Sequence, residues 1–333
     1  MGSSLTEKVS VGHKHVLGNI LVGAFRKAGI FVILIVCLCI FGALSPALVS
    51  PSHLLSLTCI AASLGIVAMG QTIVMLAGSF DLSVGATMTL INVIGAGLFG
   101  GSEHNLIPIL VLLLGVGAVV GFINGIGITK LKIPAFMMTL GMWLVLRGVV
   151  LVYTKGGPKG FWPPSMQFLG KGWIYGTIPA ATVLWVVLSV AGIYMFRKTA
   201  WGRYIYATGG NPKTVFLSGI RVHSVLILAF TLCGLLAAIA GIVLSGYVGW
   251  GSFQVGGEQY LLNSLAAAVL GGTTFSGGVG GLSGTLGGAY LLTVIDSVLT
   301  MVGVGYAGRL IFTGSVLIVF TAFYEKMSEK WMS

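Results

Sequence analysis

Two carboxylates stand inside apolar stretches of this chain, where an ionisable group is costly and therefore often functional. Asp81 occurs in the polar interruption Gly-Ser-Phe-Asp-Leu-Ser-Val-Gly at residues 78–85, with no basic residue nearby, and Asp296 lies deep in a later apolar run. Such a carboxylate can bind a cation or proton, line a path for a polar solute, or accept backbone N–H bonds where a helix is broken. Residues 78–85 predict an unwound segment, which a membrane tolerates only against protein or a water-filled cavity.

Uncharged polar side chains also interrupt the apolar runs, at Gln71, Asn124 and Asn263. Each can hydrogen-bond a passing hydroxyl group or a neighbouring helix, and the second use is commoner. Ser83 has the spacing to cap the helix that follows the interruption. Phe80 is either a gate residue or ordinary packing, and Asp296 either a functional acid or half of an interhelical pair.

A weak internal repeat relates the interruption to a later segment. Residues 76–85 and 270–280 both pass from an apolar run through glycine and a hydroxyl residue to a phenylalanine, and the second copy contains Thr274 and Phe275. Paired, glycine-interrupted segments in two halves of a membrane protein predict a substrate site where the halves meet. Both copies are therefore candidates to line a path.

The composition indicates an all-α integral membrane protein. Hydrophobic residues make up 56% of the 333 residues and charged residues only 8%, whereas soluble domains carry about 25% charged residues. The apolar runs are continuous over about 17–25 residues, as spanning helices require, and do not alternate as barrel strands do. The net charge of +11 does not indicate nucleic acid, because the basic residues lie in connections between the runs.

We expect about ten transmembrane helices, some discontinuous or re-entrant. The predicted segments are 29–48, 54–78, 84–100, 106–128, 135–153, 180–196, 223–249, 260–272, 282–302 and 309–324. The eighth is short for a span, so a re-entrant segment is an alternative. The transmembrane domain is predicted at 29–324, between a polar segment at 1–28 and a tail at 325–333.

Charge sets the predicted orientation. Lys and Arg gather at 1–28, 129–133, 197–222 and in the tail, and are absent from the tips at 101–105 and 250–259. The exception is the outer connection at 154–179, which contains Lys155, Lys159 and Lys171, but long connections follow the rule less strictly. By the positive-inside rule both termini are cytoplasmic. Arg147, near the outer end of the fifth segment, can extend its side chain outward.

Residues 197–222 are too polar to span a membrane and predict a short exposed helix. Asn211 can cap it, Pro212 suits its first position, and Gly219 ends it after about two turns. The helix exposes Val215, Phe216 and Leu217. A linker carrying positive charge is the alternative, but a linker does not need a capped helix with an apolar face, so we favour a docking surface.

Several stretches together resemble the ribose-type sugar permeases, the membrane subunits of bacterial ABC importers within the branched-chain amino acid/ribose permease superfamily. They cover nearly the whole chain in the expected order: 78–85, 132–136, 146–149, 201–211, 217–220 and 266–273. The resemblance implies a bacterial cytoplasmic (inner) membrane location, a second permease subunit (a homodimer or a paralogue), a cytoplasmic ABC ATPase and a periplasmic or lipid-anchored solute-binding protein. It also implies that the docking surface is an ATPase coupling helix, formed by Gly209, Gly210, Asn211, Thr214, Val215, Phe216, Leu217, Ser218 and Gly219.

We therefore expect an ATP-driven importer subunit for a monosaccharide or related polar solute. The residues expected along the path are Gln71, Phe80, Asp81, Ser83, Asn124, Asn263, Thr274, Phe275 and Asp296. For Asp81 we favour a structural role, since a low-affinity path for a neutral sugar needs no fixed charge. Gln254 and Glu258 lie on an outer loop that can meet the solute-binding protein.

The alternative function is a stand-alone ion-coupled transporter, with Asp81 and Asp296 as cation or proton sites. The sequence shows no enzyme chemistry, metal cluster or cofactor motif. It lacks the Gly-x-x-x-x-Gly-Lys-Ser/Thr loop, so ATP hydrolysis is expected on a separate chain.

Overall fold

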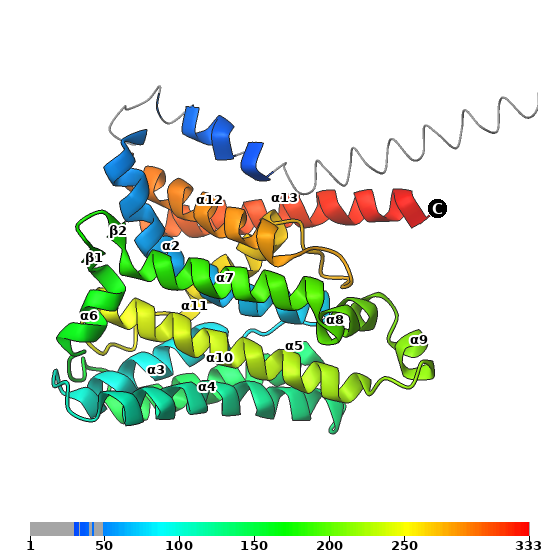
Figure 1. The fold of residues 1–333 in the computed structure, drawn as a ribbon, viewed down its shortest axis with the longest axis horizontal. Helices are drawn as coiled ribbons and strands as arrows, with labels where there is room; N and C mark the ends of the chain where they lie inside the picture. The colour runs from blue at the N-terminus through cyan, green and yellow to red at the C-terminus, as the bar shows by residue number, and fades with distance from the viewer. Residues whose placement is uncertain (1–29, 33, 40–41, 43–48, 333) are drawn as a thin grey trace, which may run out of the picture.

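The computed structural model describes residues 30–32, 34–39, 42 and 49–332, with side chains described as far as residue 323. This part of the chain is a helical bundle with two very short strands (Figure 1). Its elements are α2 (Pro51–Leu76), α3 (Val84–Phe99), α4 (Leu106–Thr129), α5 (Ala135–Thr154), α6 (Pro164–Lys171), β1 (Trp173–Ile174), β2 (Ile178–Pro179), α7 (Ala180–Lys198), α8 (Ala200–Gly210), α9 (Pro212–Leu217), α10 (Val222–Val248), α11 (Gly257–Leu270), α12 (Leu282–Met301) and α13 (Tyr306–Met332).

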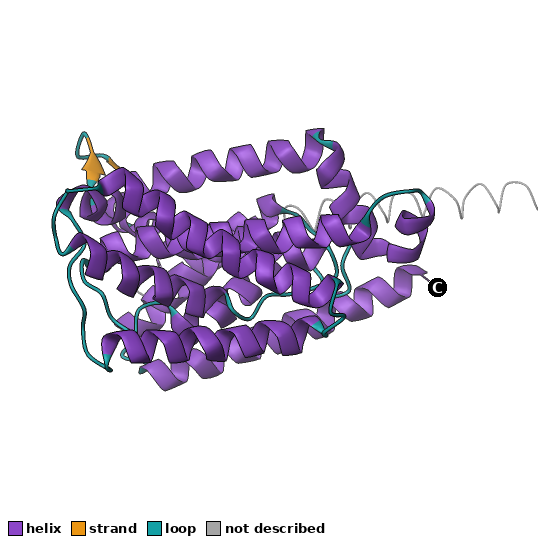
Figure 2. Cartoon of the chain, turned by 90° about the horizontal axis from the view of Figure 1, so that it is seen from below, coloured by secondary structure: helices purple, strands orange, loops and turns teal. Residues whose placement is uncertain are grey.

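Long helices run along the length of the bundle (Figure 2). The connection at 154–179 folds as α6 and an antiparallel hairpin in which Trp173 pairs with Pro179, and it lies at one end, here called the hairpin end. α8 and α9 lie at the opposite end, the α9 end (Figure 1). The two longest polar connections therefore occupy opposite ends of the molecule, as the alternation of crossings predicted.

Seven helices among the described residues are long and apolar enough to cross a membrane: α2, α4, α5, α7, α10, α12 and the Tyr306–Phe323 part of α13. α3, with 16 residues, and α11, with 14, are shorter than the roughly 20 residues that a span needs. The chain is thus a multi-pass helical membrane protein, and the count of ten is not confirmed. The short α11 agrees with the re-entrant alternative.

Some predicted boundaries fall outside the described residues or differ from those of the structure. The segment at 1–28 lies outside the described residues, as does most of 40–48. The tail at 325–333 was expected to follow the last helix, but α13 continues through it to Met332. The run Thr-Gly-Gly-Asn-Pro at 208–212 is typical of a turn, but α8 remains helical through Gly210 and the chain leaves the helix only at Asn211.

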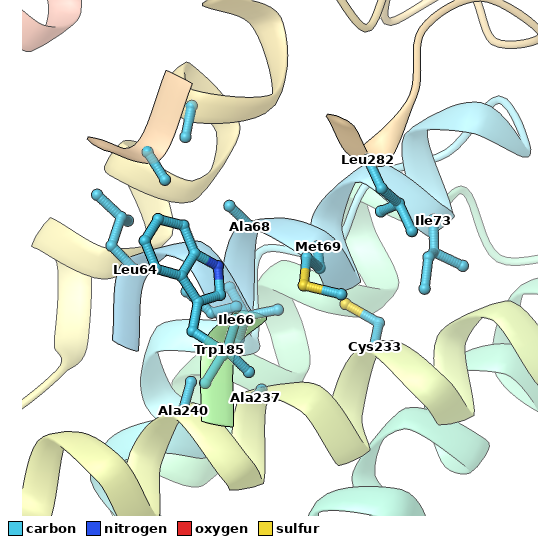
Figure 3. Packing of buried hydrophobic residues seen from close by; sticks show 14 of the residues in the cluster. Leu64, Ile66, Ala68, Met69, Ile73, Trp185, Cys233, Ala237, Ala240 and Leu282 are labelled. Atoms are coloured by element: carbon cyan, nitrogen blue, oxygen red, sulfur yellow. The ribbon is translucent and has the colours of Figure 1, made fainter. Parts of the chain in front are cut away.

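α2 is the central helix of the bundle. Of its most apolar 18-residue window, 94% is buried within the protein, whereas for α5 the corresponding figure is 17%. Small residues allow this close packing: Trp185 of α7 lies against Gly65 of α2, and Met69 of α2 meets Cys233 of α10 (Figure 3). α2 is therefore a core helix, while α5 has mostly exposed apolar side chains.

The glycines spaced by four in α4 pack against α10. A Cβ atom added to Gly125 would lie 2.7 Å from the Cα of Ile227, and one added to Gly121 would overlap the carbonyl oxygen of Phe230. Only a residue without a side chain permits this backbone approach. This packing holds Asn124 on α4 close to the unwound segment.

Candidate functional site

Residues 77–83 are unwound between α2 and α3, as the sequence predicted. Its side chains divide between two sides of the bundle. Phe80 and Leu82 pack with the apolar residues of α11 and α13, whereas Asp81 and Ser83 are buried and bond toward α4. The break therefore presents an apolar face to one side of the bundle and a polar face to the other.

Asp81 is held by neutral donors. One of its carboxylate oxygens accepts the N–H of Ser83 at 2.8 Å and the hydroxyl of Ser83 at 2.6 Å. The Nδ2 of Asn124 approaches the two carboxylate oxygens at 3.5 and 3.4 Å and donates to the Ser83 hydroxyl at 2.9 Å. The ion pairs of the described residues are Arg147–Glu258 and Asp296–Arg309, so no basic side chain pairs with Asp81.

The capping role predicted for Ser83 is wrong. Its side chain makes no cap bond to α3, because its hydroxyl group is engaged by Asp81 and Asn124. The carbonyl of Ser83 still accepts the first N–H of the helix, from Thr87, at 2.8 Å.

Gln71 satisfies the backbone of the break. With its amide oriented so that both ends are bonded, the nitrogen donates to the carbonyl oxygen of Asp81 at 3.1 Å and the oxygen accepts the Asp81 N–H at 3.2 Å. These backbone groups have no helical partners, and a buried site offers no water to replace them. The sequence placed Gln71, Asp81, Ser83 and Asn124 in one list, and the structure joins them in one hydrogen-bonded group, here called the Asp81 cluster.

The second copy of the repeat meets the first. The rings of Phe80 and Phe275 pack edge to face, with centroids 6.0 Å apart and planes at 89°. The N–H of Gly278 donates to the carbonyl of Leu76, the last residue of α2, at 2.9 Å. Thr274 is buried beside this contact and its N–H donates to the carbonyl of Val279 at 3.2 Å.

Asn263 and Asp296 lie elsewhere. Both line a small void between α11, α12 and α13. Asp296 accepts a hydrogen bond from the Nη1 of Arg309 at 3.0 Å, which is the interhelical pair that the sequence left as one of two interpretations. The predicted path residues thus fall into three groups: the Asp81 cluster, the Phe80–Phe275 contact and the Asp296 pair.

α9 is a short helix with an exposed apolar tip. Asn211 caps it by accepting the N–H of Thr214 at 3.1 Å, and Pro212 is its first residue. All three apolar residues were predicted to be exposed. Phe216 and Leu217 are, at 71% and 84%, but the prediction is wrong for Val215, which is buried. The predicted cap is confirmed, but the helix is one turn and a half, because it ends at Leu217.

α8 joins this helix to the unwound segments. At Gly209 an added Cβ would overlap the carbonyl oxygen of Leu76 and come within 2.5 Å of the N–H nitrogen of Gly278. Gly78 faces Gly209 at 3.7 Å by the same measure. The ends of both breaks therefore meet the last turn of α8, in a contact that we call the glycine junction.

A cleft of about 440 Å³ lies on the other side of the break. It is lined by residues of α3, α5, α13 and the 253–259 segment, among them Trp143, Arg147, Phe253, Gln254 and Glu258. Arg147 lies over the ring of Trp143, 5.1 Å from its centroid, and its Nη1 is 2.8 Å from a carboxylate oxygen of Glu258. Sequence reasoning missed Trp143, because an aromatic residue in an apolar run carries no signal that separates a cleft from lipid. It missed Phe253 because a single aromatic residue in a connection carries no signal that separates a site from ordinary surface.

Comparison with known proteins identifies the family of this chain. A family model described as the permease component of branched-chain amino acid transport systems matches residues 53–321. The ribose import permease protein RbsC of Bacillus subtilis is 36% identical over 315 residues, which cover 92% of this chain and 95% of that protein. The fructose import permease protein FrcC of Rhizobium meliloti is 35% identical over 271 residues, covering 78% and 74%.

A third relative, the autoinducer 2 import system permease protein LsrC of Yersinia enterocolitica, is 39% identical over 237 residues, or 71% of this chain and 65% of that protein. No solved structure matches the chain significantly. The matches to the family model and to RbsC extend across both unwound segments and the α8–α9 region. This multi-pass protein belongs to the family of branched-chain amino acid transport system permease components.

Proposed function

We propose that this protein is the membrane-spanning subunit of an ATP-driven importer for a monosaccharide or a related small polar solute. The family and the named activities of its relatives, which import ribose, fructose and autoinducer 2, support this function over ion-coupled transport. The importer works in the bacterial cytoplasmic membrane with both termini inside. A solute-binding protein delivers the solute, and a second permease subunit completes the path.

The main structural support for this function is the exposed apolar tip of α9. Phe216 and Leu217 form an apolar patch on a capped helix, at the end of the bundle where the basic residues of 197–222 gather. Burying one leucine side chain contributes about 1.5–3 kcal/mol to an interface. A groove on a cytoplasmic ATPase fits such a helix, and helix-in-groove docking is a recurrent mode of recognition.

The glycine junction can transmit movement of the docked ATPase to the solute path. α8 follows directly on α7 and leads into α9, and its last turn touches the ends of both breaks through Gly209. Because backbone meets backbone there, a displacement of α9 cannot be absorbed by side-chain rotation. We infer that ATPase closure moves α8 and α9 together and shifts the two breaks relative to each other, which alternates access.

In this mechanism the Asp81 cluster keeps the first unwound segment in one conformation. Its four side chains are 0–1% exposed and satisfy one another and the Asp81 backbone, apart from Asn124 Oδ1, which has no partner. It holds the break in one conformation, so that Phe80 stays on the side of α11 and α13. We therefore propose that Gln71, Ser83 and Asn124 position the break, and that Phe80 and Phe275 face the solute path.

The testing experiment is co-purification from the native membrane. A Leu217→Asp variant places a charge in the docking patch, and Tyr175→Asp is the matched control, because Tyr175 is 97% exposed at the hairpin end. We expect an ATPase subunit to purify with the wild type and with Tyr175→Asp, and to be lost from an intact Leu217→Asp protein.

Absence of any ATPase from an intact wild-type preparation would overturn the proposal in favour of a stand-alone transporter. Uptake that persists without ATP and stops when the ion gradient collapses would do the same.

A further inference from the structure

The cleft near the hairpin end lies where two discontinuous elements begin. Its floor comes from Ala86 and Thr89 in the first turns of α3, and from Gly257 at the start of α11. The N–H of Gly257 donates to the hydroxyl of Thr89 at 3.1 Å, so the two helix starts are joined directly. α5 and Tyr306, the first residue of α13, line it as well. Its volume of about 440 Å³ falls within the usual range of small-molecule sites.

The lining combines aromatic rings with neutral hydrogen-bonding groups. Trp143 and Phe253 offer apolar surfaces, while Gln254 offers both a donor and an acceptor. The two charges present, on Arg147 and Glu258, neutralise each other at 2.8 Å. A site without net charge does not select an ion. Rings that cover the C–H face of a solute, beside amides that bond its hydroxyl groups, suit a neutral polyhydroxylated molecule.

An apolar layer lies deeper along the same elements. On α11, Leu265 is about 12 Å beyond Gly257, and on α13, Leu317 is about 16 Å beyond Tyr306, at 1.5 Å per residue. These two leucines pack with Phe80 and Phe275 in one hydrophobic cluster. The polar cleft and the apolar layer therefore follow each other in the direction from the hairpin end toward the α9 end.

We propose that the cleft is the site where the permease receives the solute, a neutral sugar, from the hairpin end. Trp143 and Phe253 stack on the solute, and Gln254 with the Arg147–Glu258 pair binds its hydroxyl groups. The layer around Phe80 and Phe275 closes the path beneath it. This inference rests on the proposed function and identifies its solute site, at a place apart from the buried Asp81 cluster.

The first experiment tests access and does not depend on the identity of the solute. Gln254→Cys and Leu317→Cys variants are treated from the periplasmic side with a membrane-impermeant thiosulfonate, with the unmodified chain as the background. We expect rapid labelling at residue 254 and little above background at residue 317. Equal labelling of both would overturn the closed layer, and no labelling at residue 254 would overturn the open cleft.

The second experiment measures transport. A panel of radiolabelled D-ribose, D-xylose, D-galactose and D-fructose is first compared in cells with and without this chain. For each sugar whose uptake needs the chain, Trp143→Ala and Gln254→Ala should lower the saturated uptake rate about tenfold, the effect of one lost contact of roughly 1.4 kcal/mol. Trp143→Phe should restore most of it. Val152→Ala is the control, because Val152 is on α5 and 81% exposed but does not line the cleft.

The outcomes separate the two proposals. Unchanged uptake by Trp143→Ala and Gln254→Ala overturns the cleft and leaves the importer in place. Loss of ATPase stimulation by the solute-binding protein in Gln254→Ala assigns this surface to protein docking, which also overturns the cleft. If the uptake of no sugar in the panel needs the chain, the proposal of a sugar importer is overturned, and the proposal of a sugar site is overturned with it.

Discussion

Replacing Gln71 with leucine tests whether one side chain stabilises the unwound segment between α2 and α3. The amide of Gln71 bonds both the N–H and the carbonyl of Asp81 and is fully buried. Leucine has a similar volume, so the substitution creates no large cavity. It leaves two backbone groups without partners in a place that water does not reach.

The expected loss follows from those two groups. An unsatisfied buried polar group costs about 1–3 kcal/mol, so two cost roughly 2–6 kcal/mol. Hydrogen bonds in membrane proteins average only about 0.6 kcal/mol in double-mutant cycles, because the unfolded chain also finds partners, which places the result at the lower end of the range. We expect Gln71→Leu to lower the free energy of unfolding by about 2 kcal/mol or more.

The assay is reversible unfolding in mixed micelles with increasing SDS, followed by tryptophan fluorescence. Met75→Leu is the control, since Met75 is also fully buried on α2. Its contact with the break is a backbone bond, from the N–H of Gly78 to the carbonyl of Met75 at 2.9 Å, which the substitution leaves in place. A volume-conserving change there costs less than about 1.5 kcal/mol. If Gln71→Leu and Met75→Leu differ by less than about 0.5 kcal/mol, Gln71 does not support the break.

Two further perturbations follow from the structure. Gly209→Ala should abolish coupled uptake, because the new methyl group would meet the backbone of Leu76, whereas Gly210→Ala should transport normally, since nothing lies within 4 Å of a Cβ there; equal uptake rates in membrane vesicles would refute the glycine junction. At the hairpin end, hydrogen bonds from the hydroxyl and N–H of Ser165 lower the pKa of Glu103 below its ordinary value of 4.5. This contact stabilises the fold fully above pH 4.5 and is lost as the pH falls through the lower folded-state pKa. Ser165→Ala should raise the pKa of Glu103 toward its ordinary value in a carboxyl NMR titration, and an unchanged pKa would contradict the hydrogen-bond account.

The sequence predicted the break but not the arrangement of its side chains. Asp81 and Ser83 stood out because polar residues within an apolar run are rare and costly. Their partners could not be read from that pattern, since Asn124 lies on another helix and reaches them only because the glycines of α4 allow close packing on α10. The wrong cap at Ser83 has the same cause, because a nearby tertiary partner took the hydroxyl group that local spacing assigned to the helix.

The sequence by itself determined the class of the protein, the helical character of its apolar runs, the unwound segment and the capped helix at Asn211. These features depend on hydropathy and on bonds between residues close in the chain, so a short stretch of sequence is enough to predict each of them. Only the tertiary structure decided that Phe80 meets Phe275, that Arg147 pairs with Glu258, and that Gly209 joins α8 to both breaks. Each of these contacts links residues that are far apart along the chain, and their approach is set by the packing of whole helices.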